Sequence, residues 1–215
     1  VVLPGEVISE TVEGLMPGLG VVVRDRKIIS TVRGTVNQVN QYISVLPITT
    51  IYSPNVGDIV VGRVSQVQKQ RWKVQINCPI SADLRLSSIF LPDEQFRRRT
   101  TADERNMRQY FDVGDLICAE VQKVLDSHIN LHTRQQLPKR LDNGILINVP
   151  SRLITRVQSH LGELKVDQFS FNTIFGLNGS IWISPQDETG NVIIPRIRNC
   201  IILLATYDQP ISLDS

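Results

Sequence analysis

Two groups of basic side chains in the middle of the chain have the clearest chemical potential. The first group has four cations and no acid between positions 59 and 82: Arg63, Lys69, Arg71 and Lys73. The second group has five arginines with only two acids among them: Arg97, Arg98, Arg99, Arg105 and Arg108. Cations on flexible side chains bind the phosphates of a nucleic-acid backbone. Binding of a single-stranded nucleic acid is therefore the first hypothesis.

The first group lies on a predicted hairpin. Lys69, Arg71 and Lys73 fall at its turn and start, where they could contact RNA phosphates or form a solvated tip. Trp72 alternates with these cations and faces the opposite side of a regular strand. It could stack on a base. A tryptophan between charged residues is more often an anchor in the core or between domains, and we favour that role.

The second group leads into a predicted helix. Arg97, Arg98 and Arg99 precede this helix in a loop, where they could contact RNA, bind the acidic surface of a partner protein or remain solvated. Arg108 is a further candidate for RNA contact. It could instead be the i,i+4 ion-pair partner of Glu104.

Two residues at the end of a later predicted strand, His132 and Arg134, are candidates for the same interface, with a surface histidine as the alternative for His132. His128 and His132 are four residues apart, but no further metal ligands cluster near them. We therefore predict neither a metal site nor a cofactor.

The sequence Gly176-Leu177-Asn178-Gly179 has the form of the G-x-x-G phosphate clamp of KH domains. Such a clamp joins two helices and usually includes a cation. Here strand-like segments flank the sequence, and Asn-Gly is a hairpin-turn signal. We therefore predict a structural turn formed by Gly176, Asn178 and Gly179.

No combination of residues predicts catalysis. The paired acids Asp93-Glu94 and Asp103-Glu104 stand in loops or at helix starts, where solubility and the helix dipole explain them. The P-loop, G-x-S-x-G and H-E-x-x-H motifs are absent. We predict that the chain is not an enzyme.

Three segments position these residues. The first, residues 1–54, predicts short strands separated by Gly and Pro turns, with period-2 alternation from Thr35 to Leu46. It is expected to form a small N-terminal β domain. Its four acids and four cations cancel, so it has no obvious phosphate-binding surface.

The second segment, residues 55–135, contains a repeated motif. Val56–Val67 is VGDIVVGRVSQV and Val113–Val124 is VGDLICAEVQKV. Each copy has a Gly-Asp turn followed by an alternating strand. The small residue in each strand, Gly62 or Ala119, suits a crowded barrel interior. We predict that the two copies are two strands of one barrel.

Other elements of this segment complete the barrel. Strands are expected over 71–77, 84–89 and 129–133. A helix is predicted over 101–111, with Thr101 as its N-cap and Glu104 as the capping-box partner. Five strands with a helix before the fourth predict an OB-fold, a barrel whose strands 2 and 3 bind oligonucleotides.

The third segment, residues 136–215, mixes strand and helix periods and predicts an α+β domain. Strands are expected over 144–149, 171–175 and 180–184. A helix is predicted over 151–161 from the spacing of its apolar residues, and another over 192–206 with Pro195 in its first turn. The predicted fold class is mostly β with an α+β part.

The composition is that of an ordinary soluble protein, with 20% charged and 41% hydrophobic residues among 215. The net charge of +2 is too small to indicate nucleic-acid binding by itself. Three distant cysteines, Cys78, Cys118 and Cys200, predict a reduced compartment. We expect no membrane helix, because no apolar run approaches about 20 residues. The first residues do not predict a secretory signal.

Several stretches resemble the cap subunits of the RNA exosome. They are spread over nearly the whole chain: VVLPGE, GDIVVGRVSQVQKQRWKV, FLPDEQFRRRTTADERNMRQYF, VGDLICAEVQKV, INLHTR and GLNGSIWI. The resemblance includes the order of the three domains. It implies that residues 136–215 form a KH-like domain and that the G-x-N-G turn braces it.

The resemblance also implies a function. The expected protein is a non-catalytic subunit that sits with other cap subunits on a ring of RNase-PH-like proteins. It would guide single-stranded RNA into the ring channel for 3'-to-5' degradation and processing, including rRNA maturation. The nucleus, nucleolus and cytoplasm are the expected locations, without membrane association. An independent OB/KH RNA-binding regulator is the alternative.

Overall fold

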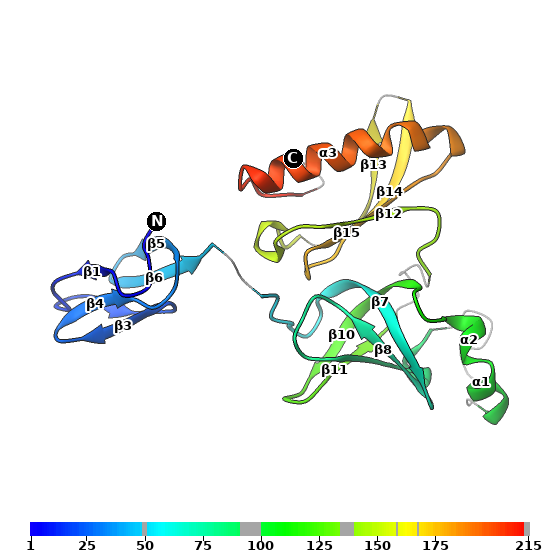
Figure 1. Cartoon of the computed structure of the whole chain (residues 1–215), viewed down its shortest axis with the longest axis horizontal. Helices are drawn as coiled ribbons and strands as arrows, with labels where there is room; N and C mark the ends of the chain where they lie inside the picture. The colour runs from blue at the N-terminus through cyan, green and yellow to red at the C-terminus, as the bar shows by residue number, and fades with distance from the viewer. Residues whose placement is uncertain (49–50, 91–99, 134–139, 158, 167, 213–215) are drawn as a thin grey trace. The chain divides into compact units, whose positions relative to one another are not determined.

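The structure, a computed structural model, describes residues 1–48, 51–90, 100–133, 140–157, 159–166 and 168–212. The chain divides into two compact units, Val1–Thr50 and Ile51–Ser215, and Figure 1 shows the elements of each. The barrel and the C-terminal α+β part both belong to the second unit. The boundaries that the sequence predicts at 54/55 and 135/136 stay a prediction.

The N-terminal unit contains only short strands. They form two three-stranded sheets, ordered β1-β4-β3 and β2-β6-β5. Asn40, with φ of 54°, lies in the turn between β5 and β6. The strands are β1 (Val7–Ser9), β2 (Met16–Pro17), β3 (Val21–Arg24), β4 (Lys27–Ser30), β5 (Gly34–Val39) and β6 (Tyr42–Pro47).

A closed five-stranded barrel opens the second unit, which confirms the predicted OB-type fold. Its strands follow the order β10-β11-β9-β8-β7 around the barrel. A 3-10 turn, Leu86–Ser88, and two short helices, α1 (Thr101–Arg105) and α2 (Met107–Tyr110), come before β10 in the chain. The strands are β7 (Ile59–Gln68), β8 (Arg71–Gln75), β9 (Ala82–Arg85), β10 (Leu116–Val124) and β11 (Ile129–His132).

The repeated motif explains the closure of the barrel, because its two copies become β7 and β10 and pair antiparallel. The second residue of each copy is a glycine at positive φ, 91° at Gly57 and 97° at Gly114, a conformation that residues with a side chain rarely adopt. Gly62 needs its small size, since an added Cβ would lie 2.5 Å from the Val74 side chain.

The helix cap differs from the prediction by one residue. Thr100, not Thr101, is the N-cap of α1, and Asp103 rather than Glu104 closes the capping box. The Asp103 carboxylate accepts the Thr100 N–H at 2.7 Å. Asp103 can do so because it occupies position N3 of the helix, whereas Glu104 is one residue too far along.

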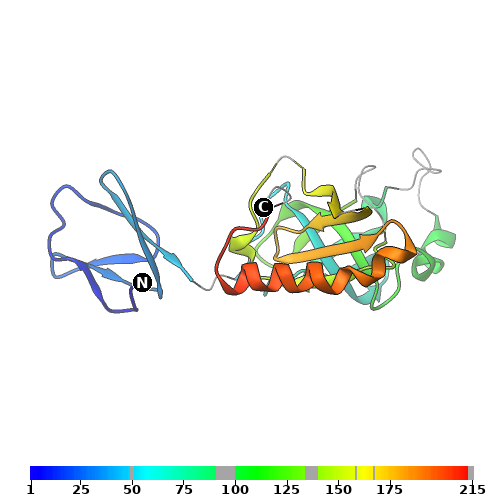
Figure 2. The ribbon, with the colours of Figure 1, turned by 90° about the horizontal axis from the view of Figure 1, so that it is seen from above.

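The C-terminal part is a four-stranded antiparallel sheet covered by one helix. Its strands follow the order β12-β15-β14-β13, and α3 (Ile194–Thr206) runs along the sheet (Figure 2). Ile194, Ile197 and Ile201 are the buried side chains of this helix. The strands are β12 (Ile145–Asn148), β13 (Leu161–Val166), β14 (Phe169–Phe175) and β15 (Ser180–Pro185).

The helix predicted over 151–161 is wrong. Of the residues described in this range, Ser151–Leu153 form a 3-10 turn and Leu161 already begins β13. Leu153 and Ile154 are buried, as their apolar character requires, but Ile154 forms a bridge with Ile211 in extended geometry. Tertiary pairing therefore overrides the helical spacing of the apolar residues.

The barrel and the C-terminal sheet share a small core. Val61 and Cys118 from the barrel pack with Ile174 and Trp182 from the sheet and with Leu141. Burial raises the pKa of the Cys118 thiol to about 12, so this cysteine is a packing residue rather than a nucleophile. Among the described helices, none has the length and apolar content needed to cross a membrane.

Candidate nucleic-acid interface

The outward side of three barrel strands carries most of the chemistry. Alternation along β8, β9 and β11 turns the residues at positions 72, 74, 82, 84, 129 and 131 into the core. The residues between them, together with the strand ends, face outward. We call this set the polar face: Arg71, Lys73, Asp83, Arg85, Asn130 and His132.

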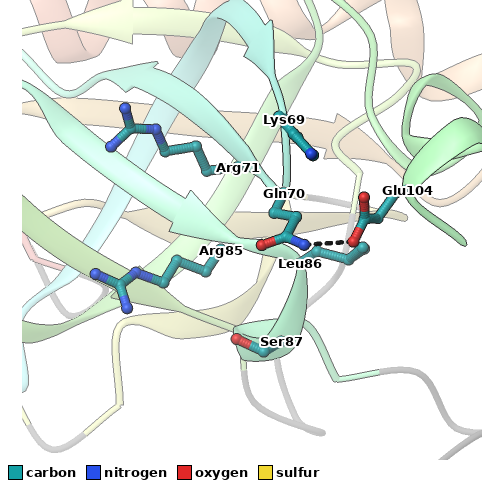
Figure 3. A pocket seen from close by; sticks show the side chains of 7 residues that line it. All are labelled: Lys69, Gln70, Arg71, Arg85, Leu86, Ser87 and Glu104. Carbon is teal, nitrogen blue, oxygen red and sulfur yellow. Dashed lines mark hydrogen bonds between the residues drawn. The ribbon is translucent and has the colours of Figure 1, made fainter. Parts of the chain in front are cut away.

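Two arginines lie side by side on the polar face. Arg71 of β8 is directly opposite Arg85 of β9 in the strand register, and both guanidinium groups extend in the same direction (Figure 3). Like charges in this position repel each other. A bound phosphate would relieve the repulsion, because arginine donates two parallel hydrogen bonds to such an anion.

One of these arginines is held in place. Arg71 Nη1 donates to Asp83 Oδ2 at 3.0 Å, and Arg71 Nε donates to Gln68 Oε1 at 2.8 Å. These bonds fix the direction of the guanidinium group while its side chain remains about half exposed, at 48%. The geometry favours a preorganised anion contact.

A hollow of about 490 Å³ adjoins the arginine pair at the tip of the β7–β8 hairpin. Gln70, at the turn with φ of 62°, donates through its side-chain amide to Glu104 of α1. The walls carry three cations and one acid, so the hollow is positively charged. Its lining residues are Lys69, Gln70, Arg71, Arg85, Leu86, Ser87 and Glu104.

The structure brings part of the predicted set together. Lys69, Arg71 and Lys73 lie at the hairpin tip and along β8, and His132 ends β11, which is separated from β8 by β9. Arg97, Arg98, Arg99 and Arg134 lie outside the described residues. Whether any of these residues binds RNA stays a prediction.

The candidate role of Trp72 in RNA binding is wrong, and the residue is instead an anchor in the core, the alternative that the sequence favours. Its side chain is 0% exposed, and its ring meets Phe111 edge to face at a centroid distance of 5.5 Å. The indole Nε1 donates to the Phe111 carbonyl oxygen at 2.8 Å. Because no face of the ring is exposed, Trp72 cannot stack on a base in this structure.

The ion pair suggested between Arg108 and Glu104 is also wrong. Arg108 pairs with Asp112 at 3.6 Å, one helical turn later, while Glu104 accepts the Gln70 amide. Arg108 does not belong to the lining of the hollow.

Sequence reasoning missed Arg85 and Asp83. Both are on β9 (Ala82–Arg85), whereas the strand predicted there covers residues 84–89, so Asp83 falls outside the prediction. The alternation of Ala82-Asp83-Leu84-Arg85 was the available signal, since two inward apolar residues put the two charged ones outward. Only the pairing of β9 with β8 makes Arg85 the neighbour of Arg71.

The G-x-N-G turn connects β14 to β15 and fastens the C-terminal sheet to the barrel. The Asn178 side chain, 2% exposed, accepts the Val61 N–H at 3.2 Å. It donates to the carbonyl oxygens of Val61 and Ile76 at 2.8 and 3.1 Å. Gly179 has φ of 85°, and an added Cβ would lie 2.3 Å from the Val149 carbonyl oxygen. The contacts support the predicted structural turn.

A buried polar cluster adds a second connection between the barrel and the C-terminal part. Asp58, 1% exposed, accepts the Tyr52 hydroxyl at 2.8 Å and pairs with Arg156 at 2.5 Å. Burial and the hydrogen bond to Asp58 raise the pKa of Tyr52. Burial, followed by the charge of Arg156, lowers the pKa of His160. The Asp58 carboxylate thus connects Tyr52 and the start of the barrel to Arg156 of the C-terminal part.

No three metal-binding side chains of the His, Cys, Asp or Glu type converge among the described residues. The groups on the polar face that could bind a ligand are therefore its cations and its hydrogen-bonding side chains.

Comparison with known families covers both units. A family of RRP4 S1 domains matches residues 51–123, and a KH-domain family matches residues 144–189. A third family, described as the exosome complex exonuclease RRP4 N-terminal region, matches residues 1–39. The S1 match coincides with the barrel strands β7 to β10.

Known proteins match over most of the chain. Exosome complex component RRP4 of Bos taurus is 40% identical over 224 residues, covering 95% of this chain and 75% of that protein. The chain belongs to the RRP4 family. The RRP4 homologue of Caenorhabditis elegans is 37% identical, and the match covers 100% of this chain and 77% of that protein. RRP4 of Saccharomyces cerevisiae is 39% identical, and the match covers 87% of this chain and 52% of that protein.

The RRP4 fold also has a counterpart among solved structures. A protein proposed to be an exosome complex RNA-binding protein superposes with a TM-score of 0.50 at 21% identity. The match covers 69% of this chain and 85% of that one. At this identity the likeness supports the fold alone.

Proposed function

We propose that this RRP4-family chain is a non-catalytic, RNA-binding cap subunit of an RNA exosome. It guides single-stranded RNA into the channel of a ring of RNase-PH-like subunits for 3'-to-5' degradation and processing, including rRNA maturation. Its relatives are named as components of the exosome complex. The observation that carries the proposal is the polar face of the S1 barrel, where Arg71 and Arg85 lie side by side.

The polar face suits the backbone of a single strand. Lys69, Arg71 and Arg85 surround one hollow, and Lys73 continues the row of cations along β8. Contacts to phosphate depend little on sequence, which a subunit that passes many RNAs requires. Arg97, Arg98, Arg99, Arg108, His132 and Arg134 are further candidates for RNA contact in this proposal.

The N-terminal unit suits a protein partner. Many of its large apolar side chains are exposed, among them Met16, Leu19, Val39 and Leu46, each more than half exposed. A unit of this size rarely leaves so much apolar surface to water unless a partner covers it. We assign this surface to contact with the ring. In cells, the nucleus, nucleolus and cytoplasm are the proposed locations, which imaging of the tagged chain tests.

A binding titration tests the RNA part of the proposal. Fluorescence anisotropy with a labelled single-stranded RNA should show binding by the whole chain. Arg85→Ala should weaken it about fivefold, because the variant cannot form one charge-assisted hydrogen bond to phosphate. Arg198→Ala, which removes an exposed arginine on α3, is the matched control and should leave the affinity unchanged. Equal affinities for both variants would contradict the proposal.

An assembly experiment tests the cap role. The folded chain should co-purify with RNase-PH-like ring subunits, and purified chain with magnesium should leave labelled RNA intact. A folded chain that fails to join the ring, yet binds one RNA sequence selectively at submicromolar concentration, would favour an independent regulator. Sustained shortening of the RNA by the isolated chain would contradict the non-catalytic role.

A further inference from the structure

One row of residues crosses all five strands of the barrel. In the strand register, Lys73 lies opposite Asp83, Asp83 lies beside Asn130, and Asn130 lies opposite Lys123. Gln66 of β7 completes the row next to Lys73. Two oxygen-bearing side chains therefore lie between two lysines, Lys73 of the polar face and Lys123 of β10.

Among the described residues, no donor is hydrogen-bonded to one acceptor oxygen on each of the two central side chains. Asp83 is 4% exposed, and its Oδ2 accepts the Arg71 guanidinium at 3.0 Å. Asp83 Oδ1 and Asn130 Oδ1 are buried atoms without a hydrogen-bond partner in the described part of the chain. Leaving such an acceptor unsatisfied costs about 1–3 kcal/mol, so buried acceptors in native proteins normally have a partner.

A donor that arrives with a phosphate backbone would satisfy both acceptors. A phosphate itself has no proton to give at neutral pH, and the Asp83 carboxylate repels it. Lys73 and Lys123 attract phosphates to both ends of the same row. The donor that RNA carries next to its phosphate is the ribose 2'-hydroxyl, on the carbon beside the one that bears the 3'-phosphate. DNA lacks this group.

Resting on the proposed RNA binding by the polar face, we propose that Asp83 and Asn130 recognise ribose 2'-hydroxyls and make the S1 barrel selective for RNA over DNA. The hydroxyl donates its proton to the free carboxylate oxygen of Asp83, and the Asn130 oxygen accepts from the next hydroxyl along the strand. Arg71 and Arg85 hold the neighbouring phosphates.

Base amino groups are the competing donors. They belong to wide, flat rings, and an acceptor recessed between two lysine side chains favours a single small hydroxyl instead. Recognition of the sugar also suits a subunit that accepts RNAs of many sequences. The two kinds of donor can be distinguished by measurement. A site that recognises the 2'-hydroxyl binds RNA more tightly than DNA for every base. A site that recognises base amino groups instead distinguishes adenine from uracil.

The test uses the whole chain and four labelled single strands of equal length: oligo(A) and oligo(U), each as RNA and as DNA. Anisotropy titrations at one salt concentration should give RNA affinities about tenfold above DNA for both bases, the effect of a hydrogen bond to a charged group. RNA with 2'-O-methyl groups should bind like DNA. Equal affinities for RNA and DNA, or a preference set by the base alone, would overturn the inference.

Variants then locate the selectivity. Asp83→Ala and Asn130→Ala should each bring the ratio of RNA to DNA affinity toward one, whatever they do to overall affinity. Glu163→Ala, which removes an exposed acid from β13, is the matched control and should keep the ratio. An unchanged ratio in both barrel variants would overturn the inference. Absence of binding to any strand would instead overturn the proposed function, and the inference with it.

Discussion

At the scale of single residues, one buried amide joins two domains. Asn178 supplies an acceptor to the Val61 N–H and donors to the carbonyl oxygens of Val61 and Ile76. An amide side chain carries both an acceptor and two donors, a combination that carboxylates and hydroxyls of this size do not offer. The turn thus acts through the side chain of Asn178, in agreement with the predicted structural turn.

Asn178→Ala should lower the free energy of unfolding by about 3 kcal/mol, because buried backbone groups on Val61 and Ile76 would be left without partners. Urea denaturation measures the decrease. Asn172→Ala is the matched control, since Asn172 is exposed on β14 and bonds only the exposed Gln186 among the described residues. A decrease no larger than that of the control would contradict the bracing role.

His160 should make the fold less stable in acid. Its pKa in the folded chain lies below the ordinary 6.5, since burial and the charge of Arg156 disfavour the protonated ring. The unfolded chain therefore binds a proton first as the pH falls. Stability is present above pH 6.5 and declines as the pH falls from there toward the folded pKa.

Thermal unfolding at pH 7.5 and 5.5 measures this effect. His160→Phe should lose less stability between the two pH values than the parent chain does. An identical pH dependence for His160→Phe and the parent would show that His160 is not the titrating group.

At the scale of elements, the barrel strands show which features the sequence could predict. The two V-G-D copies lie at equivalent places: Gly57 N–H donates to the Val121 carbonyl oxygen, and Gly114 N–H donates to that of Val64. A local turn followed by an alternating strand suffices to predict such elements. The prediction of a helix over 151–161 is wrong because its apolar residues belong to a 3-10 turn and to the start of a strand instead.

The candidate site could be predicted only in part. Arg71 and Lys73 were recognisable because they stand in a stretch without acids. Arg85 and Asp83 were not, because their role arises from register with a strand about 12 residues earlier, which composition does not reveal. The burial of Trp72 followed from alternation, and its hydrogen bond to Phe111 required the tertiary fold.

Trp72 provides a spectroscopic prediction for the barrel. In a Trp182→Phe background, the remaining indole should emit as a buried tryptophan, resist quenching by iodide and keep its emission when RNA saturates the chain. The reason is that its ring lies within the core. Efficient iodide quenching that RNA suppresses would contradict this position and restore stacking on a base.

At the scale of the whole molecule, the second unit combines two domains that share a core. The cluster around Val61, Cys118 and Trp182, the Asn178 turn and the Asp58–Arg156 pair all cross from the barrel to the C-terminal part. The polar face of the barrel therefore belongs to a larger compact unit that also includes the C-terminal part. The N-terminal unit forms a separate compact body with an exposed apolar surface.

Residues 51–215 should therefore unfold in one cooperative transition. Calorimetry on this fragment should give equal calorimetric and van't Hoff enthalpies, the sign of two-state behaviour. In the Asn178→Ala variant the barrel and the C-terminal part have one shared connection fewer, so the transition should broaden. Two resolved transitions in the unmodified fragment would contradict the shared core.

The salt dependence of RNA binding tests the central claim most directly, because each phosphate held by a cation releases counterions. Titrations of single-stranded RNA across salt concentrations should give a linear fall of log affinity with log salt. The double variant Arg71→Ala/Arg85→Ala should reduce the slope by about 1.4, or about 0.7 for each phosphate that is no longer neutralised. Lys165→Ala/Arg198→Ala, which removes two exposed cations elsewhere, should leave the slope as it is. An unchanged slope in the barrel variant would contradict RNA binding by the polar face.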